Sequence, residues 1–188
     1  FGFQLTTALF FAYSVSGANW PAWRGPQGTG VCSEQDLPIH WSQKQNVRWR
    51  TPLPDRGNST PIVWGNRVFI TQAVESEGRR EVMCFDRTTG TMIWKSGVKG
   101  VKPDLTHELN PPCAASPVTD GERVIASFAS AGLFCYDLDG TELWRRDLGK
   151  QLHIWGNGAS PIIHEDLCIL NFGPGAATFL IALDKKTG

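Results

Sequence analysis

Three segments of ten residues repeat along the chain and align without gaps: Pro61–Ile70, Pro117–Ala126 and Pro161–Leu170. Each follows a residue with a small hydroxyl side chain, which is Thr60, Ser116 or Ser160. A sequence that repeats at intervals of 40 to 50 residues folds into repeated structural units that stack on one another. This repeat therefore limits the possible folds more than any other feature of the chain.

A second motif, Gly-x-x-x-Trp, follows the first two of these segments. It pairs Gly90 with Trp94 and Gly140 with Trp144, and a third copy reaches its glycine at Gly188, where the sequence ends. The three glycines are 50 and 48 residues apart (from 90 to 140 and from 140 to 188). An aspartate precedes each glycine by three or four residues. Aspartate accepts hydrogen bonds from backbone amides and glycine adopts positive φ, so each motif predicts a tight turn before a strand.

Each repeat contains four short segments with the composition of strands. In the first copy, an apolar run precedes a turn at residues 65–66, and the segments 67–72, about 80–86 and 91–95 follow. Antiparallel strands joined by such turns form a four-stranded sheet. Four strands in each ~45 residues are typical of the blade of a β-propeller. The predicted fold class is therefore all-β, a propeller of four-stranded antiparallel blades.

The predicted domain is an incomplete propeller over residues 19–188. Blade one covers 58–95, blade two covers 115–147, and a partial blade three of three strands covers 159–188. The segment 46–51 carries Trp49 and has the sequence of an isolated fourth strand, so we expect it to close the ring. The chain starts on Phe1 and stops within a repeat, and we therefore interpret it as part of a longer protein.

The first residues differ in kind from the rest. The run from Leu5 to Tyr13 is largely apolar and uncharged, and Ser16 and Ala18 suit a signal-peptidase site that leaves Asn19 as the first mature residue. A membrane anchor is the alternative, but the run is shorter than the ~20 residues of a spanning helix. We therefore predict a truncated signal peptide over 1–18, without its Met and basic n-region, export to the periplasm or cell envelope, and no transmembrane segment after it.

The charges are balanced, with 18 basic and 18 acidic residues. Because no long basic run is present either, we expect no nucleic-acid partner. Five cysteines in an exported chain suggest disulfides. Three of them, Cys84, Cys135 and Cys168, fall at strand positions of the repeat and are expected in the core. Cys32 and Cys113 are left, and whether they pair is open.

The motif Asp-x-x-Thr-Gly-x-x-x-Trp, seen at residues 86–94, resembles the repeat of the pyrroloquinoline quinone (PQQ)-type propellers. That family includes the quinoprotein alcohol dehydrogenases and the outer-membrane assembly factor BamB. The opening Trp20-Pro-Ala-Trp23-Arg-Gly-Pro26 resembles exported bacterial members of it. The resemblance covers residues 19 to 188 and implies a propeller of eight blades.

The resemblance also implies a structural role for the tryptophans of the repeat. Each is expected to dock between neighbouring blades with its indole near the glycine of a turn. This role applies to Trp49, Trp94 and Trp144 and to the glycines Gly90 and Gly140.

Two long connections lead from the fourth strand of one blade to the first strand of the next. In propellers such connections gather at one mouth of the central channel. The candidate residues for binding a ligand or partner there are His107 and Asn110 in residues 97–115, and His153, Trp155 and Asn157 in residues 150–159. Loops that carry polar and aromatic side chains suit a binding platform. A solvated loop with an aromatic lid is the alternative.

Two functions fit the sequence. The first is a non-catalytic exported binding or scaffold module with BamB-like architecture, which holds a protein partner or a small ligand at the mouth. The second is a PQQ- and Ca²⁺-dependent dehydrogenase that oxidises an alcohol or sugar. No metal-ligand spacing, catalytic set or cofactor site is identifiable, and no two cysteines are adjacent as in quinoprotein alcohol dehydrogenases. We favour the binding module. A sensor domain attached to a kinase or protease is a third possibility.

Overall fold

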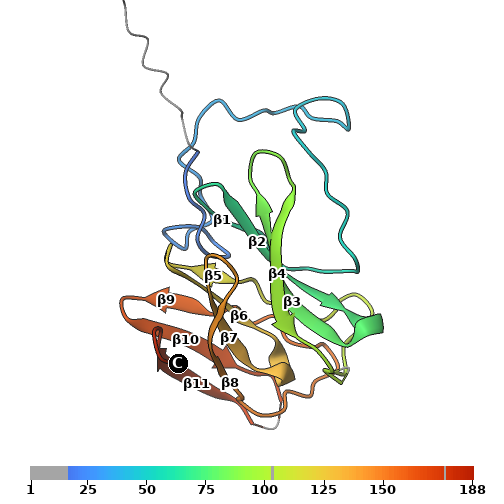
Figure 1. Cartoon of the computed structure of the whole chain (residues 1–188), viewed down its shortest axis with the longest axis vertical. Coiled ribbons are helices and arrows are strands. Elements are labelled where there is room, and N and C mark those ends of the chain that lie inside the picture. Colours follow the sequence, from blue (N-terminus) through green and yellow to red (C-terminus); the bar gives the residue numbers. More distant parts are fainter. Residues whose placement is uncertain (1–16, 103, 176) are drawn as a thin grey trace, which may run out of the picture.

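Three antiparallel sheets make up the structure, which is a computed structural model that describes residues 17–102, 104–175 and 177–188. Blade one has the strand order β1-β2-β3-β4, with β1 (Ile62–Trp64), β2 (Arg67–Val74), β3 (Arg79–Asp86) and β4 (Met92–Val98). A short 3-10 helix, η1 (Glu75–Glu77), joins β2 to β3 (Figure 1). The predicted all-β architecture of four-stranded blades is confirmed.

Blade two repeats this order with β5 (Val118–Thr119), β6 (Arg123–Ser127), β7 (Leu133–Asp137) and β8 (Glu142–Arg146). Its β6–β7 hairpin holds a second 3-10 helix, η2 (Ala129–Ala131). Blade three has three strands, β9 (Ile162–His164), β10 (Leu167–Phe172) and β11 (Phe179–Asp184). The third and fourth strands shift register at the same place in both complete blades, between Cys84 and Phe85 and between Cys135 and Tyr136. The two complete blades therefore share the same irregularity in strand pairing.

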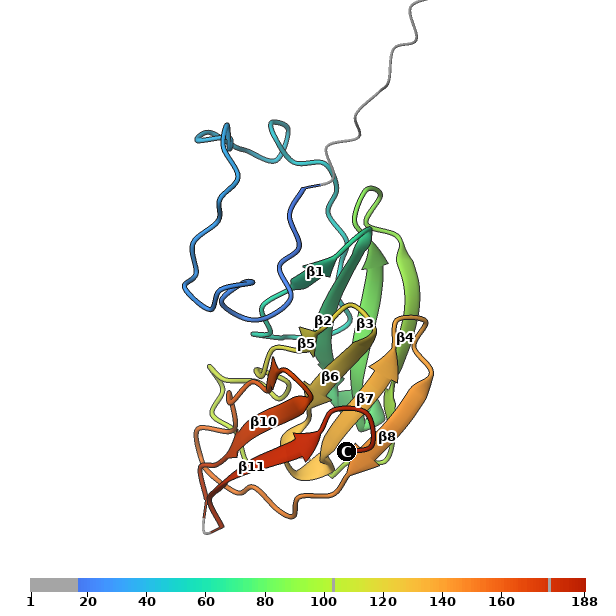
Figure 2. The same cartoon turned by 90° about the vertical axis from the view of Figure 1, so that its left-hand side faces the viewer.

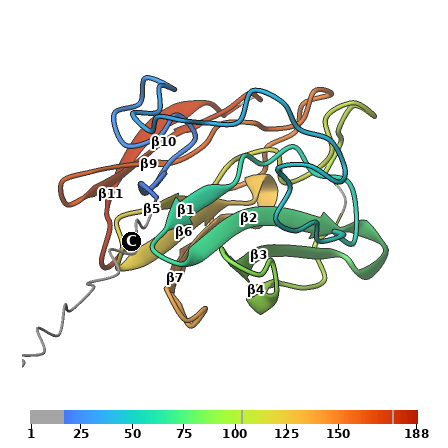
Figure 3. The same cartoon turned by 90° about the horizontal axis from the view of Figure 1, so that it is seen from above.

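The blades share cores in pairs because successive side chains of a strand face opposite sides of its sheet. In blade two, Val124, Phe134 and Tyr136 pack with side chains of blade one such as Phe69 and Cys84. The alternating residues Ile125, Leu133 and Cys135 pack with Cys168, Leu170 and Phe172 of blade three. Seen from above, blade two accordingly lies between its neighbours (Figure 3). Its central strands are buried on both faces, which explains why β6 and β7 read as nearly continuous apolar runs.

A tryptophan and a glycine meet at each boundary between repeats. A Cβ atom placed on Gly140 would lie 2.7 Å from Cδ2 of Trp94, and one on Gly188 would lie 2.8 Å from Cδ2 of Trp144. Trp49 lies against Gly90 in the same manner. Only glycine leaves room for an indole here, and all three glycines have positive φ.

The indole N–H groups repeat as well. Nε1 of Trp49, Trp94 and Trp144 donates to the carbonyl oxygens of Arg87, Leu138 and Lys185, at 2.9, 2.9 and 3.0 Å. Each acceptor is the residue that follows the turn aspartate of the next repeat. The indole thus fills the space above the glycine and also satisfies a carbonyl of the turn.

The closing strand predicted over residues 46–51 stays a prediction, because the last blade, which it would complete, is not among the described residues. No strand hydrogen bonds are made by these residues, although Trp49 occupies the position against Gly90. A strand requires a neighbouring strand as its partner, and none of the described residues lies in a strand beside this segment. The connection from residue 31 to 48 is instead exposed and extends away from the sheets (Figure 2).

The segment just before that connection is tied to the first strands. The backbone of Trp20 pairs with Val63 of β1 through two hydrogen bonds of 2.8 Å, and Thr119 N of β5 donates to the Pro21 carbonyl at 2.9 Å. Residues 19–21 therefore run along the free edges of β1 and β5. Residues 1–16 of the predicted signal peptide lie outside the described residues. Among the described residues, no helix has the length and apolar character to span a membrane.

All five cysteines are free thiols. Cys84, Cys135 and Cys168 are fully buried, as expected for core positions. Cys113 is buried and Cys32 is exposed, so these two do not pair in this structure. Burial raises the pKa of the Cys113 thiol to about 12, which keeps it protonated at neutral pH.

Candidate functional site

The two long connections between blades contact each other at their tips. The rings of His107 and Trp155 lie 4.6 Å apart, and the Asn110 side-chain amide donates to the Trp155 carbonyl oxygen. A Cβ on Gly156 would lie 3.0 Å from Cγ2 of Thr106, so the two backbones approach closely at a glycine with positive φ. Three of the five candidate mouth residues are therefore brought together.

The other two candidates, His153 and Asn157, make hydrogen bonds within the second connection. Nδ1 of His153 accepts the Trp155 backbone N–H at 3.3 Å, and Oδ1 of Asn157 accepts the Ala159 N–H at 2.9 Å. Hydrogen bonds of this kind shape a loop. His153 and Asn157 thus position the loop that presents Trp155.

The contacting connections expose large apolar side chains. Trp155 is 55% exposed and Leu109 is 77% exposed. Three more exposed apolar residues belong to the same two connections: Leu105, Leu152 and Ile154. We call these five residues and His107 the mouth surface. Grouped apolar side chains in water are typical of an interaction site rather than of a solvated loop.

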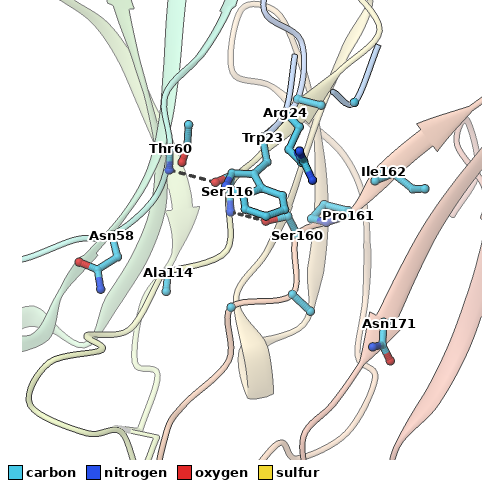
Figure 4. A pocket seen from close by; sticks show the side chains of 14 residues that line it. Trp23, Arg24, Asn58, Thr60, Ala114, Ser116, Ser160, Pro161, Ile162 and Asn171 are labelled. Atoms are coloured by element: carbon cyan, nitrogen blue, oxygen red, sulfur yellow. Dashed lines mark hydrogen bonds between the residues drawn. The ribbon is translucent and has the colours of Figure 1, made fainter. Parts of the chain in front are cut away.

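A cavity of about 550 Å³, here called the inner pocket, lies at the same end of the first strands β1, β5 and β9. These three edge strands are neighbours, because β5 contacts both β1 and β9. Most of the lining comes from the segments that enter them and from the N-terminal segment, and β10 adds Asn171. The lining includes Trp23, Arg24, Asn58, Ser116, Ser160 and Asn171 (Figure 4). Gly158 and Ala159 of the second connection also line it, so the pocket adjoins the mouth surface.

The hydroxyl residues of the repeat form a row along this pocket. Thr60 N donates to Ser116 Oγ at 2.9 Å, and Ser116 N donates to Ser160 Oγ at 2.9 Å (Figure 4). The row links the three blades at their inner edge. Because each serine oxygen accepts a backbone N–H, its own hydroxyl proton remains available for a bound molecule.

The N-terminal segment supplies the outer wall of the inner pocket. Trp23 is 58% exposed and lines the pocket together with the serine row, and the Arg24 guanidinium stands 5.8 Å from the centroid of the Trp23 ring (Figure 4). Nη2 of Arg24 also donates to the Thr29 carbonyl at 3.0 Å. Arg24 is the only charged residue of the described lining. The pocket therefore offers an aromatic face, a positive charge, amides and hydroxyl donors.

The sequence indicates the mouth residues, but it assigns no role to Trp23 and Arg24. Trp23 and Arg24 belong to the Trp-Pro-Ala-Trp-Arg-Gly-Pro stretch, and Thr60, Ser116 and Ser160 had been aligned only as members of the repeat. The signal was the hydroxyl residue that precedes each repeat proline, since a side chain repeated at the inner end of each blade must face a common axis.

Structures with the same arrangement are known. A europium-containing methanol dehydrogenase superposes with a TM-score of 0.52 and 14% identity over 71% of this chain and 23% of its own. The quinohemoprotein alcohol dehydrogenase ADHIIG from Pseudomonas putida HK5 gives a TM-score of 0.54 and 17% identity, over 74% of this chain and 20% of its own. At such identities the likeness shows the fold. The chain spans about a fifth of the length of these two proteins.

BamB from Moraxella catarrhalis superposes with a TM-score of 0.46 at 16% identity, over 73% of this chain and 36% of its own. No curated protein matches the sequence. The family described as outer membrane protein assembly factor BamB matches residues 31–151 and 78–188, which together take in most of the chain. The chain thus belongs to this family of PQQ-type β-propeller proteins.

Proposed function

We propose that the protein is a non-catalytic binding module of the cell envelope, which holds a protein partner at the mouth surface. The observation that carries this proposal is the contact between the two connections, which packs His107 against Trp155, while the same two connections expose five large apolar side chains. Aromatic and aliphatic side chains held on a rigid platform are the anchors of protein interfaces.

Contacts to the segment before β1 support the rigidity of this platform. Arg56 Nη1 donates to the Glu108 carbonyl at 2.7 Å, and Asn58 Nδ2 donates to the Leu109 carbonyl at 3.2 Å. Residues entering all three blades are therefore joined at this end of the molecule. A partner that binds here meets a surface that needs little ordering, which lowers the entropic cost of association.

A PQQ-dependent dehydrogenase is the second candidate, favoured by the shared fold. The indole of Trp23 and the guanidinium of Arg24 offer a stacking face and a positive charge for a flat anion. Calcium, however, takes carboxylate and amide oxygens as ligands. The described residues around the inner pocket include two asparagines but no carboxylate, and nowhere in the described chain do three His, Cys, Asp or Glu side chains gather as metal ligands. This lining does not fit a calcium–quinone pair.

The experiment places a photo-cross-linking amino acid at Trp155 or Leu109 in the natural full-length protein, in cells that produce it. Leu143 on β8 is the matched control, because it is also apolar and 48% exposed but lies on an outer strand. We expect one discrete protein adduct from positions 155 and 109 and none from 143. Equal labelling from all three positions would contradict a specific mouth surface.

Catalysis is tested on the same preparation. PQQ and Ca²⁺ are added, and dye-linked oxidation of alcohols and sugars is measured together with the absorbance of bound quinone. The binding module shows neither stoichiometric quinone uptake nor turnover. Turnover that depends on both additions would replace it with the dehydrogenase.

We further propose that the protein is exported through the signal peptide predicted over residues 1–18. The apolar run and the small residues Ser16 and Ala18 support this. Fusion of the natural protein from its own start codon through residue 60 to an alkaline phosphatase that folds only outside the cytoplasm should give active enzyme, and fusion of residues 19–60 should not. Activity from neither fusion would contradict export by this segment.

A further inference from the structure

Three lysines surround a second recess, on the boundary between blades one and two. Lys99 and Lys102 follow β4, and Lys150 follows β8. The recess has a volume of about 430 Å³ and also takes in Ser130 of η2 and Leu152. We call it the lysine recess. It shares Leu152 with the mouth surface, but none of its polar lining residues belongs to the mouth surface.

The charges of this recess are unbalanced in a chain that has no net charge. Three of the seven lysines of the sequence line it, and Asp104 is its single carboxylate, which leaves a formal charge of +2. None of the salt bridges among the described residues involves these three lysines or Asp104. The recess therefore gathers like charges without the partners that would offset their repulsion.

Two acidic residues of the adjoining hairpin are paired with an arginine of their own. Val101 N donates to the Gly78 carbonyl at 3.0 Å, which places η1 next to the recess. Glu77 of η1 lies 3.8 Å from Arg79, and Arg79 also pairs with the buried Glu81 at 2.8 Å. These carboxylates already face an arginine.

We propose that the lysine recess binds the phosphate of a phosphomonoester. A phosphomonoester carries a charge of about −1.5 to −2 at pH 7, which matches the +2 of the recess, and its three oxygens accept hydrogen bonds from several ammonium groups at once. The volume exceeds that of phosphate alone, and Leu152 with Val101 gives the rest of the ligand an apolar wall. The ligand is either a soluble phosphate ester or a lipid whose headgroup ends in a phosphate.

The test titrates the natural full-length protein with glycerol 3-phosphate, and separately with vesicles that contain phosphatidic acid or phosphatidylglycerol in phosphatidylcholine. We expect saturable binding that weakens with added salt and strengthens from pH 5 to pH 7, as the monoester takes its second charge. Binding of soluble glycerol 3-phosphate indicates a soluble ester, and binding of phosphatidic acid vesicles alone indicates a lipid. Equal binding of phosphatidylglycerol, a diester, or no binding in either arm would overturn the proposal.

Variants locate the site. Lys99→Gln, Lys102→Gln and Lys150→Gln should each lower the affinity about tenfold, as expected for loss of one charge-assisted hydrogen bond. Lys44→Gln and Lys186→Gln are matched controls, because both lysines are exposed and lie outside the recess. Asp104→Asn removes the only carboxylate and should raise the affinity severalfold, a gain that misfolding cannot produce. Equal losses in the recess and control variants, or weaker binding by Asp104→Asn, would contradict the assignment.

Discussion

At the interface of blades one and two, the contacting groups come from positions that the repeat supplies, whereas the inner pocket takes its outer wall from a segment that occurs once. Trp94 meets Gly140 and the Leu138 carbonyl, and the same contacts recur one blade further on. Trp23 lines the same pocket as the serine row without a counterpart in the other blades, and more than half of its surface is exposed. Repeated positions join the blades, and unrepeated ones supply the exposed surface that we propose for binding.

Trp94→Ala should produce the largest loss of stability. It removes a large, partly buried indole between two blades together with its Nε1 hydrogen bond to the Leu138 carbonyl, and we expect a loss of about 3 kcal/mol in the free energy of unfolding. Urea unfolding followed by circular dichroism measures it. Trp41→Ala is the control, because Trp41 is 71% exposed, and should change the unfolding free energy by less than about 0.5 kcal/mol. Similar losses in the two variants would mean that Trp94 does not join the blades.

Gly140→Ala tests the same interface through the glycine that contacts the Trp94 indole. The added methyl would meet the indole of Trp94 at 2.7 Å, and the backbone has φ of 87°. Gly65→Ala isolates the second effect, because Gly65 has φ of 55° but no atom within 4 Å of the added Cβ. We expect about 1 kcal/mol from the backbone at Gly65 and about 2–3 kcal/mol at Gly140. Equal losses at the two glycines would show that the indole moves aside freely.

The turn aspartates make the blade interfaces sensitive to acid. Backbone N–H groups of Thr89 and Thr88, and the amide of Asn66, donate to the Asp86 carboxylate and hold its pKa below the ordinary value of 3.8. The pKa of Asp184 is lowered by the backbone amides of its own turn in the same way.

A carboxylate whose pKa is depressed on folding stabilises the protein at pH above the unfolded pKa, and this contribution is lost as the pH falls through the folded pKa. The melting temperature should therefore be nearly constant above pH 5 and fall below about pH 4. Asp86→Asn should lower it at pH 7 and flatten its decline in acid, measured by thermal unfolding at several pH values. An unchanged decline in this variant would assign the acid sensitivity to other groups.

The sequence predicted the blades and the fold because both depend on local, repeated patterns. Strands β1 to β4 begin and end within a few residues of the segments predicted for the first blade, since turns and apolar alternation determine where a strand stops. The strand predicted at 46–51 stays a prediction. Its composition suits a strand, but its pairing depends on a neighbouring blade that the described residues do not include.

The sites were harder to predict than the fold. The sequence predicts that the loops of His107 and Trp155 share one mouth, but it does not predict that the two rings touch. Their packing depends on the paths of two irregular connections. The inner pocket depends on the pairing of Trp20 with Val63, a contact across 43 residues without any periodic signal. The lysine recess joins Lys99 and Lys102 to Lys150, which lies 51 and 48 residues further along the sequence, and the three come together only once blades one and two have stacked.

Trp23→Ala should have the smallest effect on stability and thereby separates the two kinds of tryptophan. Since its ring is 58% exposed and its backbone neighbours Trp20 and Pro21 make the contacts to β1 and β5, we expect a change below about 0.5 kcal/mol in the free energy of unfolding. The urea titration used for Trp94→Ala measures it under the same conditions. A loss as large as that of Trp94→Ala would make Trp23 a wedge that holds the inner strands together. A negligible loss would mean that the fold does not need the Trp23 indole. The exposed indole, which lies where three blades meet, would then be free to serve as the wall of a binding pocket.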